Sequence, residues 1–450
     1  ELSSNLEEPD RLGGRLTFSG DIQPIFDSKC TSCHAAAVRP MPAAGLSLDT
    51  WELLLMGSRH GEAIIPFDAD RSLLVRLAAD RSGPAHPGEL GADTLSSDEL
   101  QAIRSWIDQG ARSDDGTVPF EGSRDLLYVC NQEDATVTIV DMDLNVVSRV
   151  VDLRDHGFSA SAKPHHVAVE PDGSAWYVSL IGDNAVAKFD RDNSLVGQFS
   201  FETPGMLALD PNSEWLYVGR SLSAPNPPAS VGRMDRTDMS GEEISVVFER
   251  PHALAVGPAG SYVYSASLGA NQIISIRASD ADVSFSPVGG ALHAFVQHVV
   301  SPDGGTMASS AQLTSRIIFF DLSDPAQPQE IWSTGTNEGP WHPSFSVDGE
   351  FLLVGNKDAN TVSFVSVDGR RVEDIVTGDG LAQPHGSFVS PDGRILYVSN
   401  RNAAGSYQPR HDFGDNLDVG TVAVIDIDAR EIVKVLEVGR FAAGINGRAR

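Results

Sequence analysis

Residues 384–398 read Pro-His-Gly-Ser-Phe-Val-Ser-Pro-Asp-Gly-Arg-Ile-Leu-Tyr-Val. The Pro-Asp-Gly triplet is typical of a tight turn, and the Ile-Leu-Tyr-Val run favours a β-strand. Successive turns of this kind lie 40, 47, 44, 45 and 44 residues apart. Their first residues are Pro171, Pro211, Pro258, Pro302, Val347 and Pro391. A repeat of this length, with four strands in each unit, predicts the blades of a β-propeller.

The two ends of the repeat region complement one another. Strands are predicted at 126–129 and 136–140 with no inner strand before them, and the chain ends with an inner strand at 440–444 that no blade follows. We therefore expect the C-terminal strand to complete the first blade. This arrangement gives seven blades in a closed ring, which leaves no free sheet edge.

A haem-attachment motif lies near the N-terminus and reads Cys30-Thr31-Ser32-Cys33-His34. Both sulfurs of such a motif lie on one helical turn and can reach the vinyl groups of one haem, while the histidine binds the iron. A redox-active Cys-x-x-Cys pair is the alternative, but it does not need the histidine. The surrounding pattern predicts helices, one of them opened by a capping box at 96–99. We predict a small all-α cytochrome c domain carrying haem c.

Residues 18–111 resemble the planctomycete-type cytochrome c domain. The matching pieces are the haem motif and residues 22–26, 45–48, 61–66, 72–74 and 106–111. In that family a Met-Pro pair before the last helix supplies the sixth iron ligand, and this chain has His86-Pro87 at the corresponding place. The resemblance implies His86 as the distal ligand. Met56 or Met41 is the alternative, and methionine ligation would raise the reduction potential.

The chain is predicted to have two domains. We expect an N-terminal tail at 1–17, the cytochrome c domain at 18–111, a polar linker at 112–123 and the seven-bladed propeller at 124–450. The repeats resemble the Tyr-Val-Thr-Asn family of β-propellers, because residues 128–131 read Tyr-Val-Cys-Asn. Cys130 is therefore interpreted as a small buried residue and not as a nucleophile.

Seven of the twelve histidines lie just before a repeat turn. They are His165, His166, His252, His293, His298, His342 and His385. Blade-entry strands line the axis of a propeller, so we expect these imidazoles to converge there. A turn preference for Pro-His, or hydrogen bonds to buried carbonyls, is the alternative explanation. Clustered imidazoles without a carboxylate in the same register favour a bound transition metal such as copper, zinc, nickel or iron.

The histidine set resembles that of nitrous-oxide reductase, whose seven-bladed propeller holds a multinuclear copper–sulfide cluster on seven imidazoles. The resemblance rests on adjacent His165 and His166, on Gly-Pro-Trp-His at 339–342 and on Pro-His-Gly at 384–386. It implies a copper cluster on the seven histidines. That family also has a C-terminal cupredoxin domain; we expect none here, so the haem would deliver the electrons. Lys357 is a candidate to supply a proton or a positive field, or an ordinary surface lysine.

The net charge and the lack of long apolar runs exclude some classes of function. The formal charge of −29 disfavours nucleic acid and anionic membranes as partners, and no apolar run is long enough to span a membrane. We predict a periplasmic or secreted copper-dependent oxidoreductase that takes electrons from a soluble donor and reduces a small molecule, nitrous oxide to dinitrogen. By analogy with that family, a head-to-tail homodimer is expected.

Two alternative functions belong to other classes. The first is a c-type cytochrome that carries electrons or binds a partner, with a non-catalytic propeller. The second is a lactonase-like hydrolase, because seven-bladed lactonases share the Pro-Asp-Gly pattern. Lactonases bind a divalent cation through carboxylate and asparagine ligands, and few acidic residues lie in register at the blade entries here.

Overall fold

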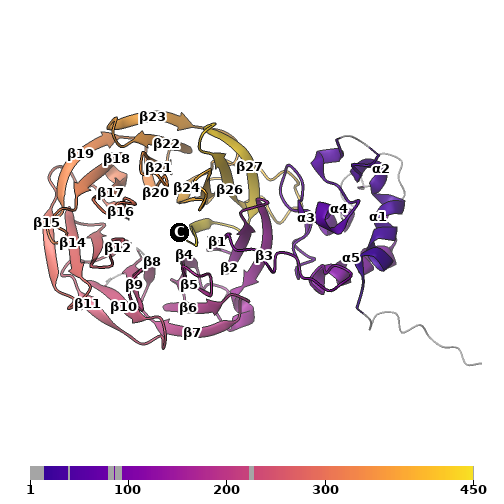
Figure 1. The fold of residues 1–450 in the computed structure, drawn as a ribbon, viewed down its shortest axis with the longest axis horizontal. Coiled ribbons are helices and arrows are strands. Elements are labelled where there is room, and N and C mark those ends of the chain that lie inside the picture. Colours follow the sequence, from indigo (N-terminus) through magenta and orange to yellow (C-terminus); the bar gives the residue numbers. More distant parts are fainter. Residues whose placement is uncertain (1–14, 39–40, 80–85, 87–93, 222–227, 449–450) are drawn as a thin grey trace, which may run out of the picture. The chain divides into compact units, whose positions relative to one another are not determined.

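A computed structural model describes residues 15–38, 41–79, 86, 94–221 and 228–448. The chain divides into two units, Glu1–Gly122 and Ser123–Arg450. The first unit is helical and the second is a ring of seven sheets (Figure 1). The predicted fold class, a small all-α domain followed by a seven-bladed propeller, is therefore confirmed. No helix of the described ranges is long and apolar enough to cross a membrane.

Short helices build the first unit. They are a π-helical turn at Phe18–Ile22, α1 (Gln23–Lys29), α2 (Thr31–His34), a 3₁₀ turn at Ala43–Gly45, α3 (Trp51–Leu55), α4 (Leu73–Ala79) and α5 (Ser97–Asp108). Phe26, Ile103 and Trp106 lie in its buried core. The predicted capping box opens α5: the Ser96 hydroxyl accepts the backbone N–H of Glu99, whose carboxylate accepts that of Ser96.

Each blade of the propeller is one antiparallel four-stranded sheet. From the axis outwards, the first three blades are β28 (Ala442–Gly447), β1 (Leu126–Asn131), β2 (Thr136–Asp141) and β3 (Val146–Asp152); β4 (Pro164–Val169), β5 (Ala175–Leu180), β6 (Ala185–Asp190) and β7 (Leu195–Ser200); and β8 (Pro204–Leu209), β9 (Trp215–Arg220), β10 (Ser230–Asp235) and β11 (Gly241–Ser245).

The other four blades repeat the plan. They are β12 (Pro251–Val256), β13 (Tyr262–Ser267), β14 (Gln272–Arg277) and β15 (Val283–Pro287); β16 (Phe295–Val300), β17 (Thr306–Ala311), β18 (Arg316–Asp321) and β19 (Gln329–Gly335); β20 (Pro340–Phe345), β21 (Phe351–Asn356), β22 (Thr361–Ser366) and β23 (Arg371–Val376); and β24 (Pro384–Val389), β25 (Ile395–Asn400), β26 (Gly420–Asp426) and β27 (Glu431–Val438). Single 3₁₀ turns lie at Leu153–His156 and Gln312–Thr314.

The Pro-Asp-Gly turns are held by side chains of the repeat itself. Between β16 and β17, the Ser301 hydroxyl donates to the Asp303 carboxylate (2.6 Å) and accepts the backbone N–H of Thr306 (3.0 Å). Gly304 has φ +77°, a left-handed conformation that favours glycine. Ser346 and Ser390 make the same bonds in two later blades. In these three blades the repeated motif thus fixes how the inner strand turns into the next strand.

The C-terminal strand closes the ring, as the sequence predicts. β28 pairs with β1, placing Ile445 opposite Val129, so the first blade contains both ends of the propeller. Cys130 is fully buried, which confirms its interpretation as a small core residue.

Candidate functional site

The haem motif lies on one backbone turn. Cys30 follows α1 directly, and α2 carries Cys33 and His34. The N–H groups of Cys33 and His34 both donate to the Cys30 carbonyl, at 3.1 and 3.0 Å. Both cysteines are free thiols and partly exposed. Two unpaired thiols on the same turn, next to a histidine, are the donor set that covalent haem attachment needs.

His86 lies close to the motif's histidine. Its ring centroid lies 5.9 Å from that of His34, at an interplanar angle of 61°. Two imidazoles that bind one metal ion through bonds of about 2 Å have their ring centroids roughly 6 Å apart. The alternative ligands Met41 and Met56 are 78% and 53% exposed. The residues present therefore fit a haem with histidine on both sides.

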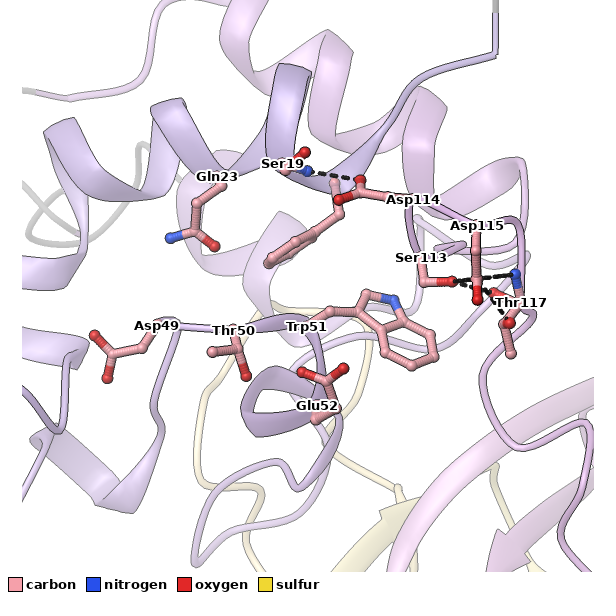
Figure 2. A pocket seen from close by; sticks show the side chains of 11 residues that line it. Ser19, Gln23, Asp49, Thr50, Trp51, Glu52, Ser113, Asp114, Asp115 and Thr117 are labelled. Carbon is pink, nitrogen blue, oxygen red and sulfur yellow. Dashed lines mark hydrogen bonds between the residues drawn. The ribbon is translucent and has the colours of Figure 1, made fainter.

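A separate pocket of about 520 Å³ lies in the helical unit. Figure 2 shows its lining, which includes Trp51 and several acidic side chains but neither haem cysteine. Asp114 accepts the backbone N–H of Ser19 (2.9 Å), and Asp115 accepts the Thr117 hydroxyl (2.8 Å). Hydrogen bonds from Ser113 and Thr117 lower the pKa of Asp115 to about 2. These carboxylates are engaged in holding the local backbone.

In the propeller, a β-bulge at the start of each inner strand positions the histidines. The pairing of all seven inner strands with their neighbours shifts register near the blade entrance. The bulge in β4 contains His165 and His166, and that in β24 contains His385. A bulge places two consecutive residues opposite one and re-aims their side chains. Neighbouring residues can therefore both face the channel.

Five of the seven predicted histidines form a chain of ring contacts. The centroid of His165 lies 5.8 Å from that of His252 and 5.5 Å from that of His385. His342 lies 4.5 Å from His385 and 6.1 Å from His166. Each ring is at most 6% exposed. Four separate blades thus bring imidazoles together in one buried place.

The other two predicted ligands lie elsewhere. His293 precedes β16, and its two nitrogens bond to the Thr314 hydroxyl (2.7 Å) and the Gly289 carbonyl (3.0 Å). His298 is the first residue beyond the bulge of its strand, and its Nδ1 contacts the Ser309 hydroxyl at 2.7 Å. Their ring contacts are with Phe295 and not with another histidine. The ring contacts among the described residues thus join five of the seven predicted ligands and not His293 or His298, and the seven-histidine ligand set stays a prediction.

The hydrogen bonds of the gathered rings also disfavour a copper cluster. His165 Nδ1 accepts from the Gln132 side-chain amide (2.7 Å), and His166 Nδ1 accepts the backbone N–H of Leu207 (3.2 Å). Each neutral ring then carries its proton on Nε2, whereas a metal ligand normally donates through its second nitrogen. Only His252 has that polarity, donating from Nδ1 to the Val296 carbonyl (2.8 Å). The described residues contain no group of three or more His, Cys, Asp or Glu placed to hold a metal ion.

A cationic and aromatic group adjoins the histidine chain. Arg401, directly after β25, lies with its guanidinium carbon 4.0 Å from the ring centroid of Trp341. The Trp341 ring also contacts His385, at 4.6 Å. The Lys357 ammonium lies 5.2 Å from the same indole and pairs with Asp358 (3.1 Å). The sequence analysis did not identify Arg401. The one feature that could have indicated it is its place directly after Asn400, which ends β25.

The electrostatics keep the imidazoles neutral. Burial lowers the pKa of His166 to about 3 and that of His252 to about 4, with neighbouring charges adding to the effect. Burial also lowers the pKa values of His165, His342 and His385, and the positive charge of Arg401 contributes to all three. The site therefore consists of neutral imidazoles beside the partly buried guanidinium of Arg401.

Comparisons with solved structures reproduce the architecture. A functionally unknown protein from Desulfotomaculum acetoxidans covers 72% of this chain and 99% of its own length, with TM-score 0.60 and 14% identity. The periplasmic gluconolactonase of Pseudomonas aeruginosa covers 72% and 98%, with TM-score 0.57 and 18% identity. Dihydro-heme d1 dehydrogenase NirN covers 95% and 99%, with TM-score 0.52 and 13% identity. At these identities the likeness shows the fold alone.

Sequence comparison adds one family. No curated protein matches the chain. Residues 30–84, which begin at the first haem cysteine and include α2, α3 and α4, match the family model of Planctomycete cytochrome C.

Proposed function

We propose that this chain is a monohaem c-type cytochrome that transfers electrons in the periplasm or outside the cell. Cys30 and Cys33 would attach the haem, and His34 and His86 would bind its iron from opposite sides. The observation that carries the proposal is the 5.9 Å separation of the two imidazoles beside the paired thiols. The Planctomycete cytochrome C match of this segment supports it.

The proposed ligation by His34 and His86 favours one kind of redox protein over another. Haem c, when bound, supplies one-electron transfer. His34 and His86 would both bind the iron, and the haem would then have no free place for a substrate. The side chains of this domain therefore serve to fix the reduction potential and exclude small ligands. That role fits electron transfer better than catalysis at the haem.

Substitution of the distal histidine tests the proposal. The wild-type protein, produced with a haem-attachment system, should give the low-spin electron paramagnetic resonance spectrum of bis-histidine iron. His86→Ala should become high-spin and bind carbon monoxide. His86→Met should raise the reduction potential, because methionine ligation favours the reduced iron. Met41→Ala and Met56→Ala are the matched controls, with unchanged spectra.

The proposal is overturned if the wild-type protein has methionine-ligated iron. Loss of the low-spin spectrum in Met41→Ala or Met56→Ala, with His86→Ala unaffected, would be that result. Failure of Cys30→Ala and Cys33→Ala to prevent covalent haem attachment would equally overturn it.

Copper-dependent reduction of nitrous oxide is the rival function, and metal analysis separates it from ours. Three of its seven predicted ligands accept hydrogen bonds at Nδ1: His165, His166 and His293. We expect one iron per chain and no stoichiometric copper after purification with added copper salts. Several tightly bound coppers per chain would reinstate the copper oxidoreductase. One bound calcium or zinc per chain would favour the hydrolase.

A further inference from the structure

Four buried N–H donors lie on side chains that contact one another in sequence at one end of the histidine chain. His385 is the central member: its ring contacts those of His165 (5.5 Å) and Trp341 (4.6 Å). The Arg401 guanidinium lies over the Trp341 ring. His165, His385 and Trp341 are each at most 6% exposed. The cluster is assembled by bulges in β4, β20 and β24 and by the residue after β25.

None of the four donors has an acceptor among the described residues. The indole N–H of Trp341 and the Nε–H of Arg401 can only donate, and both are buried without a protein partner. Both nitrogens of His385 are unpartnered, so the N–H of either neutral tautomer is unused. Gln132 donates to Nδ1 of His165, so the neutral ring carries its proton on Nε2. This Nε2–H of His165 has no acceptor among the described residues. Buried donors of this kind are costly unless something accepts from them.

The only charged side chain among the four donors, Arg401, is positive. The described residues place no carboxylate within ion-pairing distance of Arg401, and the nearby Asp358 is already paired with Lys357. Asp358 attracts Arg401 only at longer range, and a largely desolvated guanidinium without a directly paired carboxylate is costly. Arg401 also opposes protonation of the neighbouring imidazoles, and the same positive potential opposes a metal cation. The missing partner is therefore an acceptor with negative charge.

We propose that Arg401, Trp341, His385 and His165 form a binding site for a small oxyanion, a carboxylate or an anion such as nitrate. Arg401 supplies the charge, and the indole and imidazole N–H groups supply directed donors. Charge-assisted hydrogen bonds to several fixed donors give such a site both affinity and shape selectivity. The site does not depend on haem ligation, so it stands apart from the proposed electron-transfer function.

Calorimetric titration of the full-length, haem-loaded protein tests the site. Sodium nitrate, sodium acetate and sodium sulfate are titrated separately in a buffer free of other small oxyanions. We expect saturable binding of nitrate or acetate, and a higher melting temperature in its presence. Arg401→Gln should weaken the binding about tenfold or more, and Trp341→Phe, which keeps the ring but loses the N–H, should weaken it several-fold.

Matched variants keep the test decisive. Arg430→Gln removes a guanidinium that also lies over an aromatic ring, 5.4 Å from Phe351, and should bind the anion as the wild type does. Arg401→Lys keeps the charge if Arg401→Gln fails to fold, and should show intermediate affinity. The proposal is wrong if none of the three anions binds saturably. It is equally wrong if folded Trp341→Phe and both Arg401 variants bind like the wild type.

Discussion

At the scale of single residues, His252 predicts an acid-sensitive propeller. Burial, opposed by its bond to the Val296 carbonyl and assisted by Arg401, lowers its pKa to about 4. Its ring faces the neutral ring of His165. An unfolded chain protonates histidine near pH 6.5, whereas folded His252 stays neutral down to about pH 4. The unfolded state therefore binds more protons in this window, and stability falls as the pH falls through it.

For each such histidine, the free energy of unfolding should fall by up to about 1.4 kcal/mol per pH unit between pH 6.5 and the folded pKa. Urea unfolding of the propeller, followed by circular dichroism at pH 7, 6 and 5, measures it. His252→Gln should flatten the pH dependence of the unfolding free energy, and His60→Gln on the helical unit should not. Equal slopes for wild type and His252→Gln would contradict this account.

The same scale shows what sequence could predict of the site. The register of histidines five or six residues before four of the turns gathers five histidines near one another. It could not separate His298, because one extra residue beyond the bulge is enough to turn a side chain to another face. Nor could it give the tautomers, which depend on donors from other strands such as Leu207. The choice between a metal ligand and a hydrogen-bonded imidazole is made by those donors.

At the scale of elements, the closing strand depends on a glycine. A Cβ on Gly444 would lie 2.2 Å from the His165 carbonyl oxygen and 2.8 Å from the His166 Cα, both backbone atoms of the neighbouring blade. Gly444→Ala should therefore destabilise the propeller, by about 1–3 kcal/mol as for other overpacked contacts. Gly122→Ala is the control, because nothing lies within 4 Å of its added Cβ. Comparable urea midpoints for the two variants would disprove the tight contact.

Blade number was predictable for a physical reason. Three of the six repeat turns hold a Ser–Asp pair within a few residues, and each of the six contains a proline or a glycine, so local chemistry marks these turns in the sequence. The closing strand lacks such a turn and was identified only because the first blade lacked an inner strand. The bulges left no comparable mark, since their position emerges from how each inner strand pairs with its neighbour.

At the scale of the whole molecule, the two units have separate cores. Every hydrophobic cluster of the described residues lies within one unit, and the helical unit is built on helices of 4–12 residues. Helices this short are marginal alone and depend on tertiary packing. A covalently attached haem would supply much of that packing, so it should stabilise this unit selectively. The propeller is closed by its own strands, so attachment of the haem should not change its melting temperature.

A cysteine comparison tests this division in one calorimetric experiment. The double variant Cys30→Ala/Cys33→Ala should lose the haem and lower the melting temperature of the helical unit by about 10 °C or more, because a group that binds only the folded state stabilises it. The propeller transition should stay where it is. Cys130→Ala removes a fully buried thiol from β1 and should lower only the melting temperature of the propeller. A single transition that shifts in both variants would mean that the two units unfold as one cooperative structure.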